Sequence, residues 1–205
     1  MTPFTVLMVC VGNICRSPMA ERLLAARLRE RAGPDAARLV RVHGAGTGDW
    51  HVGRPMHPVA AAEVRRRGGD PDAFGARLLS PAMVAESDLV LTASSDQVRL
   101  VVASGASVGH DARAHTFVLG EFVRLVDGAD LDALPPFAPT AEAVAARGRA
   151  LVAALDGRRD GVRGTDEVPD PYGLGPEEFA ATADQIDRAV DRLADLLTAG
   201  AVVPR

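Results

Sequence analysis

The chain has no lysine and few cysteines or aromatic residues, with two cysteines, one tryptophan and one tyrosine among 205 residues. All 23 basic residues are therefore arginine, a bias from which no function follows. Cys10 and Cys15 lie too close together in the chain to staple a fold, so we expect a reducing, cytoplasmic location. No matching pair of histidines or cysteines stands near them, which argues against a structural zinc site.

Long apolar runs and a strong net charge are also absent. The apolar runs are too short to cross a bilayer and Met1-Thr2-Pro3 resembles no signal peptide, so we expect no membrane partner. A net charge of −4 argues against a nucleic-acid partner, because such proteins neutralise phosphates with basic residues. With 47% hydrophobic and 24% charged residues, we expect residues 1–205 to form a single domain with a full core.

The most informative stretch follows a short apolar run at residues 6–9, which has the length of a strand. It reads Cys10-Val11-Gly12-Asn13-Ile14-Cys15-Arg16-Ser17-Pro18. Ser17 is a good helix N-cap, Pro18 suits the first helical position, and apolar residues then recur at helical spacing. Such a junction of strand, tight loop and helix aims unpaired backbone N–H groups at one point, which suits a phosphate-sized anion.

This loop also carries reactive groups. A helix N-terminus and a nearby guanidinium stabilise a thiolate, so Cys10 is the candidate nucleophile. Arg16 offers a planar fork of donors that can hold two phosphoryl oxygens. Gly12 lets the backbone approach an anion closely, and Asn13 tolerates left-handed backbone geometry and can bond the loop's own amides. The chemistry implied is attack of sulfur on phosphorus; the alternative is a buried structural cysteine beside a solvated arginine.

Together with Met19-Ala20-Glu21, the loop resembles the signature of the low-molecular-weight protein tyrosine phosphatases. The resemblance implies a phosphate-binding loop, a hydrogen bond from the Ser17 hydroxyl to the sulfur, and no cofactor or metal. The phosphate-binding residues would be Val11, Gly12, Asn13, Ile14, Cys15, Arg16 and Ser17. The resemblance also implies a disulfide between Cys10 and Cys15 under oxidation, which protects the sulfur; the alternative is that Cys15 is a small packing residue.

Two later segments resemble the substrate loops of the same family. Residues 49–54 resemble its wall loop, in which Trp50 borders the substrate ring. Residues 168–173 resemble its acid loop, where Asp170 stands between two prolines that restrict the backbone and supplies the proton for the leaving oxygen. A plain turn is the alternative for these residues. Tyr172 would form the opposite wall, and the Gly173 that follows it resembles bacterial members.

Strand-like and helix-like segments alternate along the chain, which predicts a parallel sheet covered on both faces. Further strands are expected at residues 39–42, 88–92 and 115–119, and further helices at 58–67, 96–102, 141–155 and 176–197. The resemblance implies an α/β flavodoxin-like, three-layer sandwich with a four-stranded parallel sheet and helices on both faces. We expect the glycine-rich residues 43–53 to form a flexible loop and Arg65-Arg66-Arg67 a solvated helix end.

The chain departs from the family pattern in two places. A long insertion around residues 127–165 precedes the acid loop, with an extended linker at 134–139, a helix at 141–155 and a mobile surface loop at 156–167. We expect the insertion to decorate the lid side or to remodel an edge; docking of a partner is the alternative. Past the third strand, Ala93-Ser94 replaces an acidic residue that the family often carries, which leaves the support of the acid loop open.

The implied function is a phosphotyrosine protein phosphatase that hydrolyses aryl phosphate esters through a cysteinyl phosphate. Its partners would be a phosphotyrosine protein and, as an active-site ligand, inorganic phosphate or sulfate; the sequence leaves the oligomeric state open. An arsenate reductase of the thiol-relay kind needs further cysteines, and none follows Cys15. A protein arginine phosphatase carries threonine where Ile14 stands. A non-catalytic phosphate-binding scaffold is disfavoured by the joint presence of Cys10, Arg16 and Asp170.

Overall fold

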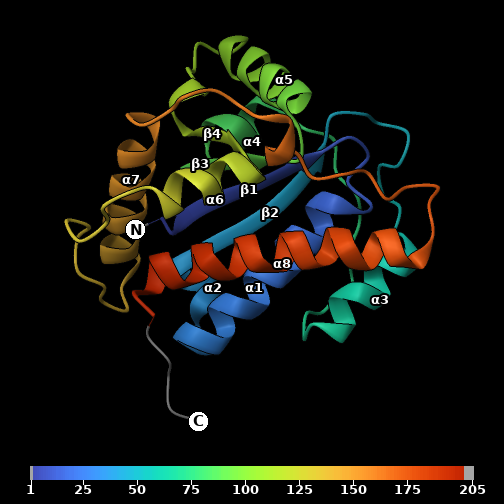
Figure 1. The fold of residues 1–205 in the computed structure, drawn as a ribbon, viewed down its shortest axis with the longest axis horizontal. Coiled ribbons are helices and arrows are strands. Elements are labelled where there is room, and N and C mark those ends of the chain that lie inside the picture. The colour runs from blue at the N-terminus through green and yellow to red at the C-terminus, as the bar shows by residue number, and fades with distance from the viewer. Residues whose placement is uncertain (1, 201–205) are drawn as a thin grey trace.

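A parallel sheet forms the centre of the molecule. The computed structural model describes residues 2–200, so Met1 and residues 201–205 of the expected domain lie outside the described residues (Figure 1). The strands lie in the order β2-β1-β3-β4 and all pair in parallel. Their bounds are Phe4–Cys10 for β1, Val40–Gly46 for β2, Leu89–Thr92 for β3 and Thr116–Val118 for β4. This order confirms the predicted α/β, flavodoxin-like class.

Helices cover both faces of this sheet (Figure 1). They are α1 (Arg16–Ala32), α2 (Ala36–Leu39), α3 (Pro58–Arg66), α4 (Pro81–Ala85), α5 (Ser95–Ala106), α6 (Leu119–Asp127), α7 (Ala141–Asp156) and α8 (Pro176–Thr198), with short 3-10 turns at Arg113–His115 and Gly164–Asp166. Along β1, Phe4, Val6 and Met8 face the core shared with α1, α6, α7 and α8, whereas Leu7 and Val9 face a smaller core with α4 and α5. This alternation fits a strand buried on both sides. No helix within residues 2–200 is both long and apolar enough to span a membrane.

Strand β2 is longer than the sequence predicts, because residues 43–46 continue the strand instead of opening a flexible loop. The glycines here permit close packing. A Cβ on Gly46 would lie 2.7 Å from the carbonyl oxygen of Val11 and 3.0 Å from the nitrogen of Asn13. Only a residue without a side chain lets β2 lie this close to the loop that follows β1.

Helix α6 has no counterpart among the predicted elements. Leu119, expected at the end of a strand, is its first residue. The helix begins directly after β4, and the carboxylate of Glu121 caps it by accepting a hydrogen bond from the Val118 N–H at 3.1 Å. The apolar run continues from β4 into α6 without a turn residue and fits a strand and a helix equally well. The sequence alone therefore does not show where the strand ends and the helix begins.

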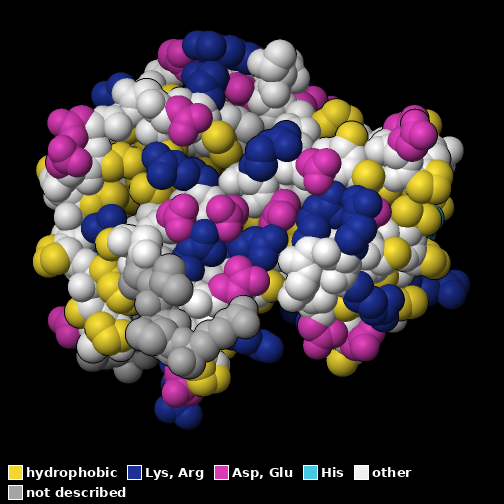
Figure 2. Space-filling view, turned by 60° about the horizontal axis from the view of Figure 1, so that its bottom comes forward, with side chains coloured by type: hydrophobic (Ala, Val, Ile, Leu, Met, Phe, Trp, Pro, Cys, Tyr) yellow, Lys and Arg dark blue, Asp and Glu magenta, His cyan; other side chains and the backbone are white. Residues whose placement is uncertain are grey.

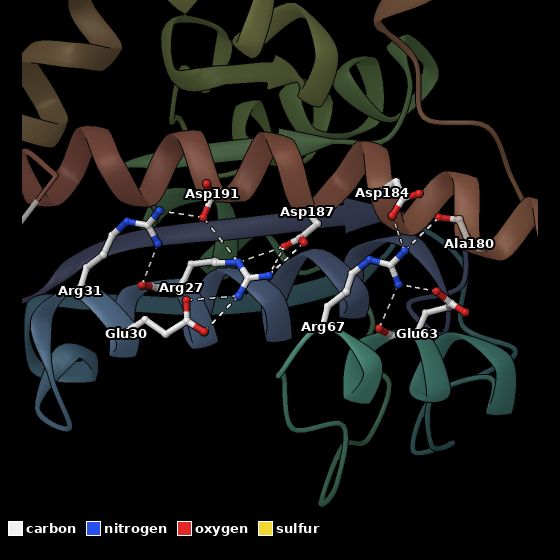
Figure 3. Close-up of polar contacts among 9 residues, drawn as sticks. All are labelled: Arg27, Glu30, Arg31, Glu63, Arg67, Ala180, Asp184, Asp187 and Asp191. Atoms are coloured by element: carbon white, nitrogen blue, oxygen red, sulfur yellow. Dashed lines mark hydrogen bonds and ion pairs between the residues drawn. The ribbon is translucent and has the colours of Figure 1, made fainter. Parts of the chain in front are cut away.

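An ion-pair ladder joins α8 to α1 (Figure 3). Nη2 of Arg27 lies 2.9 Å from both carboxylate oxygens of Asp187, and Nη2 of Arg31 lies 2.7 Å from Asp191. Paired residue numbers rise together, so the two helices run parallel. The face presented in Figure 2 accordingly shows arginine and acidic side chains interleaved in a band across its middle.

Arg67 departs from the predicted solvated helix end. Its side chain is only 9% exposed and bonds Asp184 and the carbonyl oxygen of Ala180, both on α8 (Figure 3). Arg65 and Arg66, by contrast, are more than half exposed, as the sequence predicts. Arg67 therefore ties α3 to α8.

Helix α7, the main element of the insertion, packs at the end of β1 that lies away from Cys10 (Figure 1). A Cβ on Gly148 of this helix would lie 2.5 Å from the ring of Phe4, the first residue of β1. Because β1 has seven residues at about 3.3 Å each, this contact lies about 20 Å from Cys10. Of the two expected places for the insertion, α7 therefore does not occupy the lid side, and a remodelled edge stays a prediction.

The segment after α7, at residues 157–167, makes specific contacts with the rest of the fold, and its mobility stays a prediction. Arg124 on α6 donates hydrogen bonds to both oxygens of the buried Asp166, at 3.0 and 2.9 Å. The guanidinium of Arg159 lies over the ring of Phe117, 3.9 Å from its centroid. Ionic and cation–π contacts of this kind fix the backbone that leads to residues 168–173.

Candidate active site

The loop between β1 and α1 turns its carbonyl groups outward. The carbonyl oxygens of Cys10, Val11 and Ile14 accept hydrogen bonds from the backbone N–H groups of Thr47, Gly48 and His57. Within residues 2–200, the N–H groups of residues 12–15 donate to no other backbone or side-chain group. These amides and the first turn of α1 are the donors that an oxyanion needs. The predicted N-cap is wrong by two residues: Cys15 is the N-cap and Ser17 lies inside the helix.

A chain of hydrogen bonds leads to the Cys10 sulfur. The backbone N–H of Arg77 donates to Oδ1 of Asn13 at 2.8 Å, which orients the amide so that its Nδ2 donates to Oγ of Ser17 at 2.8 Å. Ser17 Oγ lies 3.0 Å from Sγ of Cys10. Since Ser17 accepts from Asn13, its hydroxyl proton serves a Cys10 thiolate or the carbonyl oxygen of Ala45, which lies farther away at 3.4 Å.

Asn13 adopts the left-handed backbone conformation that the sequence predicts, with φ of 51°. Its side chain does not bond the loop's own amides, which was the expected contact, but joins Ser17 to Arg77. Arg77 in turn donates to the carboxylate of the buried Glu21 at 2.6 Å. Burial raises the pKa of Glu21, and the charge of Arg77 opposes that rise. The loop thus has a supporting layer that its motif does not show.

Arg16 is almost fully buried and reaches two points of the predicted acid loop. Its Nη1 donates to the carbonyl oxygen of Val168 at 3.2 Å, and its Nη2 lies 2.5 Å from Oδ2 of Asp170. The Nε donor is buried and bonds no group within the described residues. Both Nη groups of Arg16 are therefore engaged with the acid loop in this structure.

Asp170 reaches the cleft from the far end of the chain. Its side chain is 49% exposed, and its Oδ1 accepts a hydrogen bond from the backbone N–H of Tyr172 at 3.3 Å. Its other oxygen binds Arg16. The carboxyl group thus lies at the mouth of the site, in contact with solvent and with the guanidinium.

These groups line a cleft of about 240 Å³. The lining residues are Cys10, Val11, Gly12, Ile14, Cys15, Arg16, Trp50, His51, Asp170 and Tyr172. The structure thus brings together every predicted site residue except Asn13 and Ser17, which are buried behind the loop. Trp50 and Tyr172 are both more than half exposed, and the ring of His51 lies between them, 6.2 and 6.1 Å from their centroids.

Two histidines belong to this region although the sequence gives them little signal. A Cβ on Gly12 would lie 2.8 Å from Cδ2 of His51, so glycine there makes room for the imidazole. The ring of His57 stacks on Phe179 at 4.8 Å and meets the edge of Tyr172 at 5.9 Å. The sequence could have indicated His51, because it adjoins Trp50 in the predicted wall loop. It could not have indicated His57, because the contacts of this ring depend on how α8 packs.

Cys15 is a buried free thiol beside the cleft. Burial, followed by the charges of Cys10 and Asp170, raises the pKa of Cys15 to about 12, although Arg16 opposes the rise. Cys15 is therefore protonated at neutral pH. Its disulfide with Cys10 under oxidation stays a prediction.

Strand order and loop together define an α/β protein with a thiol and a set of backbone donors, unpaired within residues 2–200, at the switch point of its sheet. The profile of the low molecular weight phosphotyrosine protein phosphatases matches residues 5–155. The chain belongs to this family. The match ends before the acid loop, so the placement of Asp170 rests on the structure.

Relatives and solved structures agree with this assignment. The chain is 42% identical over 99 residues to low molecular weight protein-tyrosine phosphatase A of Mycobacterium bovis, a match that covers 48% of this chain and 58% of the relative. It is 36% identical over 134 residues to a low molecular weight protein-tyrosine-phosphatase of Streptomyces coelicolor, covering 65% and 78%. Vibrio vulnificus Wzb in complex with benzylphosphonate shares the fold, with a TM-score of 0.63, 22% identity and coverage of 93% and 97%.

Proposed function

We propose that this chain is a phosphotyrosine protein phosphatase that works through a cysteinyl phosphate on Cys10. The observation that best supports the proposal is the cleft, which a thiol, a guanidinium and a carboxyl group line together with two aromatic side chains. Trp50 and Tyr172 offer aromatic surface along this cleft to a phenyl ring, and aromatic rings bury well against one another. The walls therefore favour an aryl phosphate over a small aliphatic one.

In the first step, the Cys10 thiolate attacks phosphorus in line with the leaving oxygen. The S–P bond forms as the P–O bond to the phenol breaks, and the protonated Asp170 gives its proton to the departing phenolate. The amides of residues 12–15 and the Arg16 guanidinium hold the three equatorial oxygens, where negative charge is concentrated. Arg16 must release Asp170 for this, since one guanidinium fork serves both, and the released, solvent-exposed carboxylate takes its proton from water before the step begins.

In the second step, water attacks the cysteinyl phosphate. Asp170, now a carboxylate, takes a proton from this water as the S–P bond breaks and inorganic phosphate forms. The leaving group is the Cys10 thiolate, which the Ser17 hydroxyl stabilises by donating its proton across the 3.0 Å contact. Asp170 ends the cycle protonated, as it began.

The proposal extends to ligand and location. Inorganic phosphate, the product, and sulfate, a tetrahedral anion of similar size, are expected to bind the loop. Vibrio vulnificus Wzb binds benzylphosphonate, which joins an aromatic ring to a phosphonate group, and this supports a phosphoryl ligand that carries an aromatic ring. A reducing cytoplasm suits the mechanism, because Cys10 acts only as a free thiol.

A panel of phosphopeptides tests the proposal. We expect the wild type to release phosphate from phosphotyrosine peptides and to leave phosphoserine and phosphoarginine peptides intact, and we expect Cys10→Ser, checked for folding by circular dichroism, to release none. Turnover of the phosphoarginine peptide alone would assign the protein to arginine phosphatases. Phosphate binding without turnover of any peptide would make it a scaffold.

A further inference from the structure

The first turn of α5 is capped by a residue far away in the chain. The N-cap residue Ser94 makes no capping bond with its side chain. Instead, Oε1 of Glu167 accepts two hydrogen bonds from Ser95, one from the backbone N–H at 3.0 Å and one from the hydroxyl at 2.6 Å. A carboxylate at a helix N-terminus satisfies an orphan donor and meets the positive end of the helix dipole.

Glu167 begins a short segment that is tied on every side. The N–H of Val168 donates to the carbonyl oxygen of Ala93, just past β3, at 2.8 Å. From α8, Nε2 of Gln185 donates to the carbonyl oxygen of Glu167 at 3.2 Å. The carbonyl oxygen of Val168 accepts from Arg16. Residues 167 and 168 are therefore fixed to the carboxyl end of the sheet, to α5 and to α8.

Asp170 itself has much weaker support. Among residues 2–200, its carboxylate forms hydrogen bonds with Arg16 and with the N–H of Tyr172 alone, and half of its side chain is exposed. Once a phosphoryl group occupies Arg16, the ion pair no longer holds the acid. Its position then depends on the segment behind it, where Pro169 and Pro171 restrict the backbone on either side.

We propose that Glu167 is a positioning residue for the general acid: its bond to Ser95 anchors the arm that presents Asp170 to the leaving oxygen. Among residues 167–169, only Glu167 has a side chain that forms hydrogen bonds, so it is the anchor that a substitution within this segment removes. The inference rests on the proposed function. It also answers what supports the acid loop where Ala93-Ser94 follows the third strand.

The same bonds lower the pKa of Glu167, with the Ser95 hydroxyl as the largest cause and its backbone N–H next. Glu167 is therefore ionised at neutral pH and stays in its strongest acceptor form.

Substrates with different leaving groups can show whether Glu167 positions the general acid or only stabilises the fold. kcat/KM for an aryl phosphate reports the step in which the phenol departs, because that step comes first. A phenol-like leaving group needs the proton from Asp170, whereas a weakly basic dinitrophenolate departs without it. A misplaced acid therefore slows only the first kind of substrate, and a loosened fold slows both.

The experiment measures kcat/KM of wild type, Glu167→Ala, Glu167→Gln and Ser95→Ala with phenyl phosphate and 2,4-dinitrophenyl phosphate. For Glu167→Ala we expect a loss of roughly 10–100-fold with phenyl phosphate and less than about threefold with the dinitrophenyl ester. Glu167→Gln keeps an acceptor and Ser95→Ala keeps the backbone donor, so both should show smaller, equally selective losses. The control is Glu177→Ala, an exposed acid in the first turn of α8, which should change neither rate.

An equal loss with both substrates, or wild-type rates in all three variants, would overturn the inference. If Glu167→Ala does not fold, the two milder variants decide by the same comparison. A wild type that hydrolyses neither ester would instead overturn the proposed function and the inference with it, so the two failures are distinguished by the wild-type measurement alone.

Discussion

Arg16 has two tasks that compete. Its guanidinium binds the Asp170 carboxylate at 2.5 Å, and the proposed mechanism needs the same group for the phosphoryl oxygens. Because Asp170 is half exposed, the pair is screened by solvent and gives way to a dianion at modest cost. The contact thus keeps the acid near the site between turnovers.

Removal of this competitor should tighten anion binding. We expect Asp170→Ala to bind inorganic phosphate about fivefold more tightly than wild type, since an exposed ion pair is worth up to about 1 kcal/mol. The fluorescence of Trp50, the only tryptophan, reports the titration because this residue lines the cleft. Equal or weaker binding by Asp170→Ala would show that the ion pair does not compete with the ligand.

His43 makes stability depend on pH. Burial, with Arg41 and Arg77 nearby, lowers the pKa of His43 from 6.5 to about 4. Between these values the unfolded chain binds a proton that the folded protein does not, so the free energy of unfolding falls as the pH drops from 6.5 to 4. The fall amounts to up to about 3 kcal/mol.

Urea unfolding at several pH values tests this. His43→Gln should lose less stability than wild type between pH 6.5 and 4, and the two should run parallel above pH 7. Identical slopes through the acid window would contradict the assignment to His43.

At the scale of elements, the ladder between α1 and α8 fixes how the two loops of the cleft lie relative to each other. Helix α1 begins at the Cys10 loop and α8 begins just after the acid loop, so their parallel packing brings both loops to one end of the sheet. The rungs are partly buried: Arg27 is 16% exposed and Asp187 is 23% exposed. Bidentate pairs with this burial contribute more than surface pairs do.

A double-mutant cycle measures the coupling free energy of one ion pair in this ladder. For Arg27→Met and Asp187→Asn we expect a coupling free energy of about 1 kcal/mol in thermal or urea unfolding. The pair Arg38 and Asp35, whose side chains are 83% and 76% exposed, serves as the control and should show coupling near zero. Equal coupling in both pairs would mean that the ladder adds nothing beyond surface charge.

At the scale of the whole molecule, the insertion adds buried contacts at the start of β1, whereas the cleft lies at the other end of this strand. Gly148 of α7 touches the buried ring of Phe4, so Gly148→Val should lower the free energy of unfolding by about 1–3 kcal/mol through overpacking. The folded variant should keep the kcat/KM of wild type, since the contact lies far from Cys10. Ala146→Val, on the exposed side of the same helix, is the control for both measurements. A loss of kcat/KM without a loss of stability would place α7 in the function of the site.

Sequence patterns predict what is local and periodic. The apolar spacing of α8 predicts a helix and the apolar run of β1 predicts a strand. The residue types from Cys10 to Ser17 indicate an anion-binding loop with a reactive thiol. Long-range contacts are beyond such patterns. The bonds from Arg16 to Asp170 and from Glu167 to Ser95 join residues 154 and 72 positions apart, and only tertiary packing determines them.

The same reason explains the errors. Gly46 looks like a flexible loop residue because the sequence does not show that Val11 packs against it, and Arg67 looks solvated because α8 lies far along the chain. Local preferences indicate whether a residue suits a turn or a solvent-exposed position. The residues packed against it in the fold determine which of these it adopts.

The most direct test of the central claim is to trap the intermediate. A reaction with a phosphotyrosine peptide, stopped by rapid denaturation and analysed by peptide mass spectrometry, should carry a phosphoryl group on Cys10 in the wild type and none in Cys10→Ser. A phosphoryl group on any other residue, or turnover by Cys10→Ser, would contradict attack by the Cys10 sulfur.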